Sequence, residues 1–234
     1  MRRFFETEHG RYILGDAREV LKELPSNEFD VVMTDPPFFG KDRHHDTGDY
    51  EVFVETLPEL HRVLKDGGWL LVYFPSNRLH KILADVTRYF EYKDRFVVEF
   101  KSTTTKGSFG DKRTLCLLAF ANGRAKIRER LYTDVIPGFE DPFIVTLHPR
   151  SSMWKPTFAT ALILSKFLRA ERPKLLDPFA GYGSIIIVAE KLGIEWTGID
   201  IDPEKFKVAE KVVKENVPLS TARKLVEEEL KSRS

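Results

Sequence analysis

The sequence predicts an α/β protein with a doubly wound, mostly parallel sheet and one antiparallel hairpin. Short apolar runs alternate with segments of helical periodicity along most of the 234 residues. The apolar runs at 95–102 and 114–121 flank a loop without such periodicity, which predicts the hairpin. Segments with residues suited to binding or catalysis follow three other apolar runs: Gly15-Asp16, DPPF at 35–38 and DPFAGYGS at 177–184. Open sheets bind ligands beyond the carboxyl ends of their strands, so these segments are expected to form one site.

Strands are predicted where short apolar runs are bounded by turn residues. They span 11–16, 29–35, 69–74, 95–102, 114–121, 174–179 and 195–201. Helices are predicted where apolar residues recur at a spacing of three to four. They span 17–24, 50–66, 76–90, 155–170, 184–193, 203–216 and, in the tail, 219–234. Pro25 ends the first helix, Gly67-Gly68 ends the second, and Ser76 is the N-cap expected for the third.

Length and composition favour one globular domain over 1–234, in which residues 122–154 form a linker or substrate loop. The apolar runs are too short to span a bilayer, and the first ten residues lack the apolar region of a signal peptide. A single cysteine, Cys116, excludes an internal disulfide and fits a reducing, cytoplasmic location. The absence of glutamine beside many Lys, Arg and Glu residues favours a heat-adapted source.

The charge of the chain is nearly balanced, at a net +1, but it is unevenly distributed. Residues 101–130 hold eight Lys or Arg residues against two acidic ones. A basic surface of this kind suits a phosphate backbone, although a solvated face of a heat-adapted protein would look the same. The adjacent His44 and His45 lack the spacing of metal ligands, so no metal site is expected.

The segment LLDPFAGYGSI follows a predicted strand and opens a helix. Gly181 and Gly183 permit a tight turn and a close approach of the backbone to a ligand. A dinucleotide fingerprint would need a third glycine where this chain has Ile186. An acidic start, Asp177, suits a cofactor with an amino-acid end, and Asp200 closes the next strand, where a carboxylate can hold a ribose. A capping turn with a surface aspartate is the alternative.

The corner TDPPFF at 34–39 is unusually stiff, because proline fixes φ and restricts the residue before it. It is either a rigid strand end or a pocket wall that holds a carboxylate, a carbonyl and a ring in fixed positions. DPPF, then WKP at 154–156, then DPFAGYGS and GIDI together resemble the S-adenosylmethionine-dependent amino-methyltransferases of nucleic acids. The order, with DPPF first, is similar to the β class, whose motifs are circularly permuted. The resemblance implies a Rossmann-like, class I methyltransferase fold.

The resemblance also implies roles for individual residues. Asp177, Phe179, Gly181, Gly183 and Ser184 would line the methionine end of the cofactor, and Asp35 would border it. Asp200 would hold the ribose with Ile201 against the adenine, Asp16 would meet the adenine amino group, and Ala17 is a further expected cofactor-binding residue. Lys155 and Pro156 would close over the methionine portion. The family's usual HPTxKP motif is interrupted here, because an insertion separates His148-Pro149 from Lys155.

The expected catalytic residues are Asp35, Pro36, Pro37 and Phe38. The Asp35 carboxylate and the Pro36 carbonyl can accept hydrogen bonds from an exocyclic NH₂ and localise its lone pair for attack on the sulfonium methyl. Phe38 would stack on a base that has left its helix. Contacts with the substrate are expected from Phe39, Lys41, Arg43, His44, His45, Lys106, Lys112 and Arg113.

Asp at the first motif position is typical of adenine-N6 enzymes, and DNA cytosine-N4 enzymes more often carry Ser, so the motif leaves the base open. The interval 122–148 is too short for a separate target-recognition domain. Structured RNA is read mainly by shape and exposed loops, which favours RNA as the polymer. The chain resembles minimal archaeal family members that act on ribosomal RNA, and this resemblance implies cytidine N4 as the target. A DNA adenine-N6 or cytosine-N4 enzyme is the alternative. Two remote alternatives are a protein glutamine methyltransferase and a non-catalytic cofactor-binding subunit. Whether the protein forms a homodimer is left open.

Overall fold

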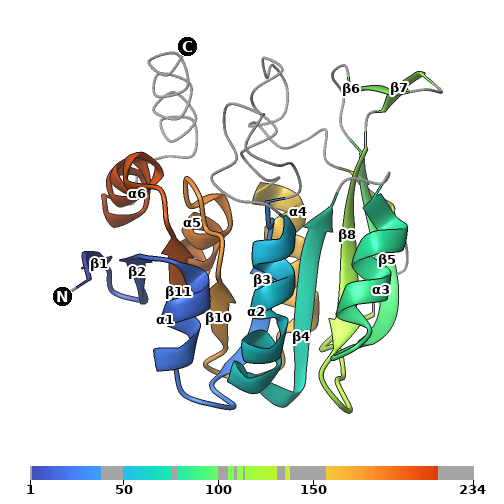
Figure 1. Ribbon diagram of the computed structural model, residues 1–234, viewed down its shortest axis with the longest axis horizontal. Coiled ribbons are helices and arrows are strands. Elements are labelled where there is room, and N and C mark those ends of the chain that lie inside the picture. The colour runs from blue at the N-terminus through green and yellow to red at the C-terminus, as the bar shows by residue number, and fades with distance from the viewer. Residues whose placement is uncertain are drawn as a thin grey trace.

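The computed structural model describes residues 2–37, 50–74, 78–99, 105–107, 110–112, 114–130, 135–137 and 157–215. Within these residues the chain forms a sheet of nine strands with helices on both faces, and a separate two-stranded ribbon (Figure 1). The strand order is β1-β2-β11-β10-β3-β4-β8-β5-β9. This is the α/β arrangement that the alternation of apolar runs and helical periodicity predicts.

Strands β2, β11, β10, β3 and β4 run parallel to one another in the middle of the sheet. Their bounds are Gly10–Leu14, Glu195–Asp200, Lys174–Asp177, Phe29–Thr34 and Leu64–Phe74. β1 (Phe4–Glu6) is antiparallel to β2 at one edge. Because the five parallel strands share a direction, their carboxyl ends meet at one edge of the sheet, the upper edge in Figure 1.

The other side of the sheet contains the predicted hairpin. β8 (Thr114–Ala121) is antiparallel to both β4 and β5 (Glu91–Glu99). The segment between β5 and β8 carries the ribbon of β6 (Thr105–Gly107) and β7 (Gly110–Lys112), which the sequence did not predict. The ribbon lies above β5 and β8, at the upper edge of the sheet (Figure 1).

The helices form two layers, with α1, α2 and α3 on one face and α4, α5 and α6 on the other (Figure 1). Their bounds are Ala17–Glu23, Tyr50–Val63, Leu79–Val86, Thr157–Phe167, Ser184–Lys191 and Pro203–Ala209, and a π-helical turn, η3 (Glu210–Lys214), continues α6. Alternate strand residues enter the two cores: Leu70 and Val72 of β4 pack under α1–α3, and Leu71 and Tyr73 pack under α4–α6. This period of two is the geometry of a strand buried on both faces.

The predicted second helix, 50–66, is three residues too long. α2 ends at Val63, and the chain enters β4 at Leu64, paired with Phe29 of β3. The Asn122 amide donates to the carbonyls of Leu64 and Lys65, at 3.0 and 3.2 Å. The Asn122 side chain, which directly follows β8, thus satisfies backbone carbonyls at the start of β4. Because this donor is distant in sequence, the local periodicity of 50–66 gives no sign of it.

The structure differs from the predicted elements at two further strands, β9 and β5. β9 (Val135–Pro137) lies inside the predicted linker 122–154 and pairs in parallel with β5. β5 begins at Glu91, four residues before the predicted start of that strand at 95. The Ser76 cap and the C-terminal helix at 219–234 lie outside the described residues.

Candidate active site

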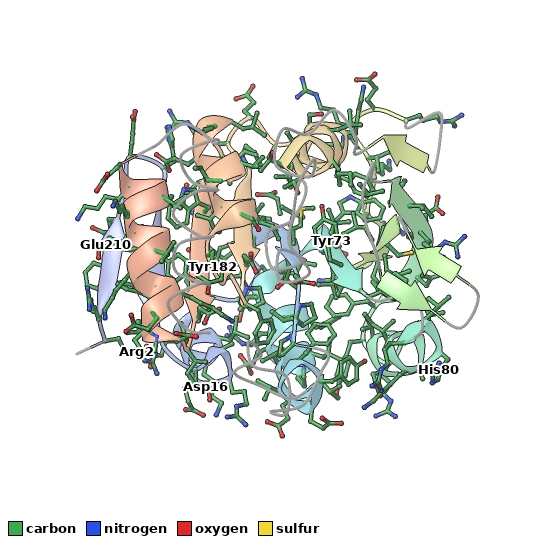
Figure 2. The ribbon with its side chains drawn as sticks, turned by 90° about the horizontal axis from the view of Figure 1, so that it is seen from above. Arg2, Asp16, Tyr73, His80, Tyr182 and Glu210 are labelled. Carbon is green, nitrogen blue, oxygen red and sulfur yellow. The ribbon has the colours of Figure 1, made fainter. Side chains whose placement is uncertain are left out.

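The three segments expected to form one site, which begin at Gly15, Asp35 and Asp177, do lie along one edge of the sheet. Asp200 ends β11, with its backbone in register with Leu14 of β2, and the Gly15 N–H donates to its carbonyl at 2.9 Å. Asp177 ends β10, which lies between β11 and β3. Thr34 ends β3 and leads directly into Asp35. Figure 2, seen from above, shows Asp16 and Tyr182 in the same half of the molecule.

The glycine loop connects β10 to α5 and has the conformation its composition predicts. Gly181 has φ +53° and Gly183 has φ +84°, both in the left-handed region that favours glycine. A Cβ on Gly183 would also lie only 3.0 Å from Cγ2 of Val213. Among the described residues, the nearest atom to such a Cβ at Gly181 is the Phe179 carbonyl oxygen at 4.0 Å, so none of these residues crowds this side of the loop.

Two residues from neighbouring strands hold this loop. The Tyr12 hydroxyl donates to the Gly181 carbonyl at 2.5 Å, and the Gly181 N–H donates to Oδ2 of Asp200 at 2.8 Å. Tyr12 is fully buried between the rings of Phe5 and Phe206. Burial raises the pKa of Tyr12, and nearby carboxylates raise it further, so the hydroxyl keeps its proton as a donor. The sequence alone does not single out Tyr12, which looks like an ordinary core residue in an apolar run.

Asp177 is a buried carboxyl, with 1% of its surface exposed. Its Oδ1 accepts from the Thr34 hydroxyl at 2.8 Å and from the Phe179 N–H at 3.2 Å. Burial raises the pKa of Asp177 to about 8, although both hydrogen bonds oppose the rise. The charges of Asp35 and Asp200 raise it further. A cationic ligand group beside this carboxyl would therefore be stabilised by it and would stabilise its charged form.

Asp200 is also buried and is firmly oriented. Its Oδ1 accepts from the Asp202 N–H at 2.8 Å, while Oδ2 accepts from Gly181. Burial raises its pKa, while the charge of Lys205 and the two backbone hydrogen bonds lower it. A carboxylate has lone pairs for further donors, so hydroxyl groups could still bind. The next residue, Ile201, is 50% exposed, as a surface for a flat apolar ring would be.

Asp16 is placed at the same edge, but Arg18 already binds both of its carboxylate oxygens. Its Oδ1 caps α1 by accepting from the Arg18 N–H at 2.9 Å, and the Arg18 guanidinium binds both carboxylate oxygens. The hydrogen bond from the Arg18 side chain, the largest cause, lowers the pKa of Asp16. Arg18 also pairs with Glu55 of α2 at 2.9 Å. Ala17 and Ser184 are both buried at this edge.

The corner after β3 is described as far as Pro37. Asp35 and Pro37 are half-buried and Pro36 is buried. Asp35 lies near enough to Asp177 for its charge to raise that residue's pKa. The remaining predicted residues lie outside the described part of the chain, or are described there by backbone only. They are Phe38, Phe39, Lys41, Arg43, His44, His45, Arg113, Lys155 and Pro156, and, in β6 and β7, the side chains of Lys106 and Lys112.

The basic window 101–130 is divided between two edges of the sheet. The ribbon β6–β7 lies above β5 and β8, along the same upper edge of the sheet that carries the site (Figure 1). Exposed Arg124 follows β8, and its backbone lies near Gly67 at the amino-terminal end of β4. The carbonyl of Lys126 accepts from Trp69, and the Arg128 N–H donates to the carbonyl of Lys166 at the end of α4. The described part of the window after β8 therefore lies away from the site.

The chain has a class I methyltransferase fold, as the resemblance implied. This fold is defined by the strand order, by the permuted connections and by the functional residues at the carboxyl ends of the strands. Residues 11–106 match the sequence model of the UPF0020 family, described as "RMKL-like, methyltransferase domain". In the described residues there is no cluster of three potential metal ligands, and no helix long and apolar enough for a membrane span.

Several sequence relatives match most of the chain. The Escherichia coli (strain K12) protein YubD is 27% identical over 197 residues, covering 82% of this chain and 84% of YubD. The type II methyltransferase M2.LlaDCHI of Lactococcus lactis subsp. cremoris is 23% identical, with 89% and 90% covered. The DNA adenine methyltransferase YhdJ of Escherichia coli (strain K12) is 25% identical, with 87% and 82% covered.

Solved structures share the fold at low sequence identity. The PvuII DNA methyltransferase, which is cytosine-N4-specific, has a TM-score of 0.72 at 15% identity, with 96% of this chain and 94% of that chain covered. The complex of M1.HpyAVI with S-adenosylmethionine has a TM-score of 0.68 at 18% identity, with 87% and 99% covered. Together the matches support the expected enzyme class, an S-adenosylmethionine-dependent N-methyltransferase. The relatives whose names state a polymer act on DNA, so the preference for RNA gains no support from them.

Proposed function

We propose that this protein transfers a methyl group from S-adenosylmethionine to the exocyclic amino group of a base in nucleic acid. The observation that carries the proposal is the pairing of β3 with β10, in which Val31 and Val32 are in register with Leu175 and Leu176. This pairing brings the corner at Asp35 and the loop after Asp177 side by side, although 142 residues of chain separate them.

The edge of the sheet has groups that fit each part of the cofactor. The buried Asp177 carboxyl suits the ammonium group of the methionine end. The open side of Gly181 leaves room beside the loop. Asp200, oriented by backbone N–H groups, suits the ribose hydroxyls, and exposed Ile201 suits one face of the adenine. Asp16 is the proposed acceptor for the adenine amino group, in competition with Arg18.

The corner that begins at Asp35 is proposed to bind and polarise the amine that receives the methyl group. The bound sulfonium provides an activated methyl group, so the protein's task is to position and polarise the amine. Asp35 and the carbonyl of Pro36 would accept the two N–H bonds of the exocyclic amine, which localises the nitrogen lone pair toward the methyl. Pro36 and Pro37 restrict the backbone, so these acceptors are held before the substrate arrives. Phe38 would stack on the extruded base.

DNA is the polymer that the named relatives favour, with the amino group of adenine or cytosine as target. Cytidine N4 in structured RNA is a second candidate. Its support is the interval from 122 to 148, which is too short to add a recognition domain that reads a DNA groove. Ordered β9 occupies part of this interval, which leaves still less of it for recognition.

The test incubates the protein and methyl-labelled S-adenosylmethionine with duplex DNA and, separately, with total RNA, and then digests both to nucleosides. Label in N6-methyladenosine or N4-methylcytidine, as the deoxy or ribo form, identifies base and polymer together. Asp35→Ala should abolish transfer with cofactor binding nearly unchanged, while Asp200→Ala should weaken cofactor binding. Absence of label in both polymers with a folded, cofactor-binding protein would refute the proposed substrate class.

A further inference from the structure

The hydroxyl of Thr34 joins the two halves of the proposed site. It donates to Oδ1 of Asp177 at 2.8 Å, and the two residues are 143 positions apart in the sequence. Thr34 is fully buried and Asp177 is 1% exposed, so water does not replace this bond. Asp35, the expected catalytic carboxylate, is the next residue after Thr34. One side chain therefore fixes a carboxyl of the glycine loop relative to the catalytic corner.

The surroundings make a donor at this position valuable. Among the described residues, the charges that act on the pKa of Asp177 are acidic: Asp35, which follows β3, and Asp200, which ends β11. On the β2 side the protonated phenol of Tyr12 donates to Gly181 instead. The Thr34 hydroxyl and the Phe179 N–H are the groups that stabilise the Asp177 carboxylate by donating to it. A hydrogen bond to a buried charged group is worth more than one between neutral groups.

We infer that Thr34 is a positioning residue for the cofactor: its hydroxyl holds the Asp177 carboxyl in the orientation that binds the ammonium of the cofactor's amino-acid end. The inference rests on the proposed function and adds a residue to it. Oδ1 takes both hydrogen bonds, so Oδ2 is the oxygen assigned to the ammonium. Loss of the hydroxyl should weaken binding of ligands that carry the ammonium and spare those that lack it.

The experiment compares Thr34→Val, which keeps the shape and removes the donor, with Thr34→Ser, which keeps the donor. Calorimetry measures the affinity for S-adenosylhomocysteine, which carries the amino-acid end, and for 5′-methylthioadenosine, which lacks it. Thr34→Val should bind S-adenosylhomocysteine on the order of tenfold more weakly near pH 7. Thr34→Ser should bind it almost as the wild type does. Affinity for 5′-methylthioadenosine should be equal in all three proteins.

The dependence on pH gives a second readout. Without the donor, Asp177 should hold its proton to a higher pH, so the rise in S-adenosylhomocysteine affinity with pH should shift upward in Thr34→Val. The ligand's own amino group titrates equally with every variant, so the difference between variants reports Asp177. Thr56→Val is the matched control, because Thr56 is another fully buried threonine, whose hydroxyl donates within α2 to the Phe53 carbonyl.

The outcomes separate the inference from the proposed function. If wild-type protein binds neither ligand, the proposed function fails. If wild type binds both and Thr34→Val loses affinity for both equally, or for neither, Thr34 is structural and the inference fails. An equal loss in Thr34→Ser would also overturn it. Should Thr34→Val fail to fold, Thr34→Ala against Thr34→Ser makes the same comparison of a hydroxyl with its absence.

Discussion

Tyr12 and Gly181 are 169 positions apart, yet the tyrosine hydroxyl donates to the glycine carbonyl at 2.5 Å. The bond passes from the second strand of the chain to the loop proposed to hold the cofactor. The same glycine donates its N–H to Asp200, so both backbone polar groups of Gly181 are held by neighbouring strands. The glycine loop is thus fixed before a ligand binds, which lowers the entropy lost on binding.

Tyr12→Phe tests this arrangement, because it keeps the ring between Phe5 and Phe206 and removes one donor. The loop should become less ordered, with a loss of about 1 kcal/mol in unfolding free energy. Cofactor affinity should fall roughly fivefold, since part of the loop's ordering would then occur on binding. Calorimetry and denaturant unfolding measure the two effects. Tyr92→Phe, at an exposed tyrosine, is the control and should change neither; an unchanged affinity in Tyr12→Phe would contradict the role.

The central fold could be predicted because its strands are buried on both faces and read as continuous apolar runs. β3, β8, β10 and β11 lie within one or two residues of their predicted bounds. The end of α2 could not be predicted, because the side chain of Asn122, which directly follows β8, donates to the carbonyls of Leu64 and Lys65 just after the helix. The strands β1, β6, β7 and β9 have three residues each, too few to carry a periodicity of their own.

The candidate site divides in the same way. Asp177, Asp200 and the glycines could be selected because residue type and spacing suggest their chemistry. Tyr12 and Thr34 could not, because each acts on a partner well over a hundred positions away, and nothing local distinguishes them from core residues. Thr34 lies within the corner TDPPFF, yet only its side-chain hydrogen bond gives it a part in the site.

Asp177→Asn should stabilise the protein at alkaline pH. The pKa of Asp177 is raised by burial to about 8, from the ordinary value of 3.8 that applies to the unfolded chain. Its contribution is fully present below pH 3.8, where both states are protonated, and is lost as the pH rises through 8. Asparagine is not subject to this loss. Its unfolding free energy should exceed that of wild type by on the order of 2 kcal/mol at pH 9 and by less at pH 6.

Thermal and denaturant unfolding at the two pH values measure this change. Cofactor binding should be lost in the same variant, because the carboxylate no longer faces the ammonium. Asp94→Asn, at an exposed aspartate, is the control for the loss of one carboxyl group. An equal effect of Asp177→Asn at both pH values would mean that the Asp177 carboxyl does not titrate in this range.

Gly183→Ala should destabilise the protein more than Gly193→Ala does. Both glycines have positive φ, +84° and +66°, so both substitutions strain the backbone by about 1 kcal/mol. At Gly193 a Cβ would meet no atom of the described residues within 4 Å, whereas at Gly183 it lies 3.0 Å from Val213 Cγ2 and 3.6 Å from the Ala209 Cβ. The crowding between α5 and η3 should therefore add about 1 kcal/mol to the cost of Gly183→Ala. Denaturant unfolding of the two variants gives this difference directly, and equal losses would argue against the close packing.

Neutralising the basic residues that follow β8 should leave nucleic-acid affinity nearly unchanged. Arg124 lies near the amino-terminal end of β4, and Arg128 bonds through its backbone to Lys166 at the end of α4, whereas the proposed site lies beyond the carboxyl end of β4. β4 pairs Leu64 with Phe29 and Val72 with Thr34 of β3, so roughly 20 Å separate its two ends, well beyond the screening length of exposed charges at physiological salt. The double substitution Arg124→Ala and Arg128→Ala should therefore keep the salt dependence of binding.

The comparison for that double variant is Lys106→Ala with Lys112→Ala in the ribbon β6–β7, on the edge that carries the site. For each lysine that no longer neutralises a phosphate, the slope of log affinity against log salt should fall by about one. Binding of a short duplex measured from low to moderate salt supplies both slopes. A reduced slope for the Arg124 and Arg128 pair alone would place the nucleic acid along the opposite edge of the sheet and would contradict an approach through the carboxyl ends of the strands.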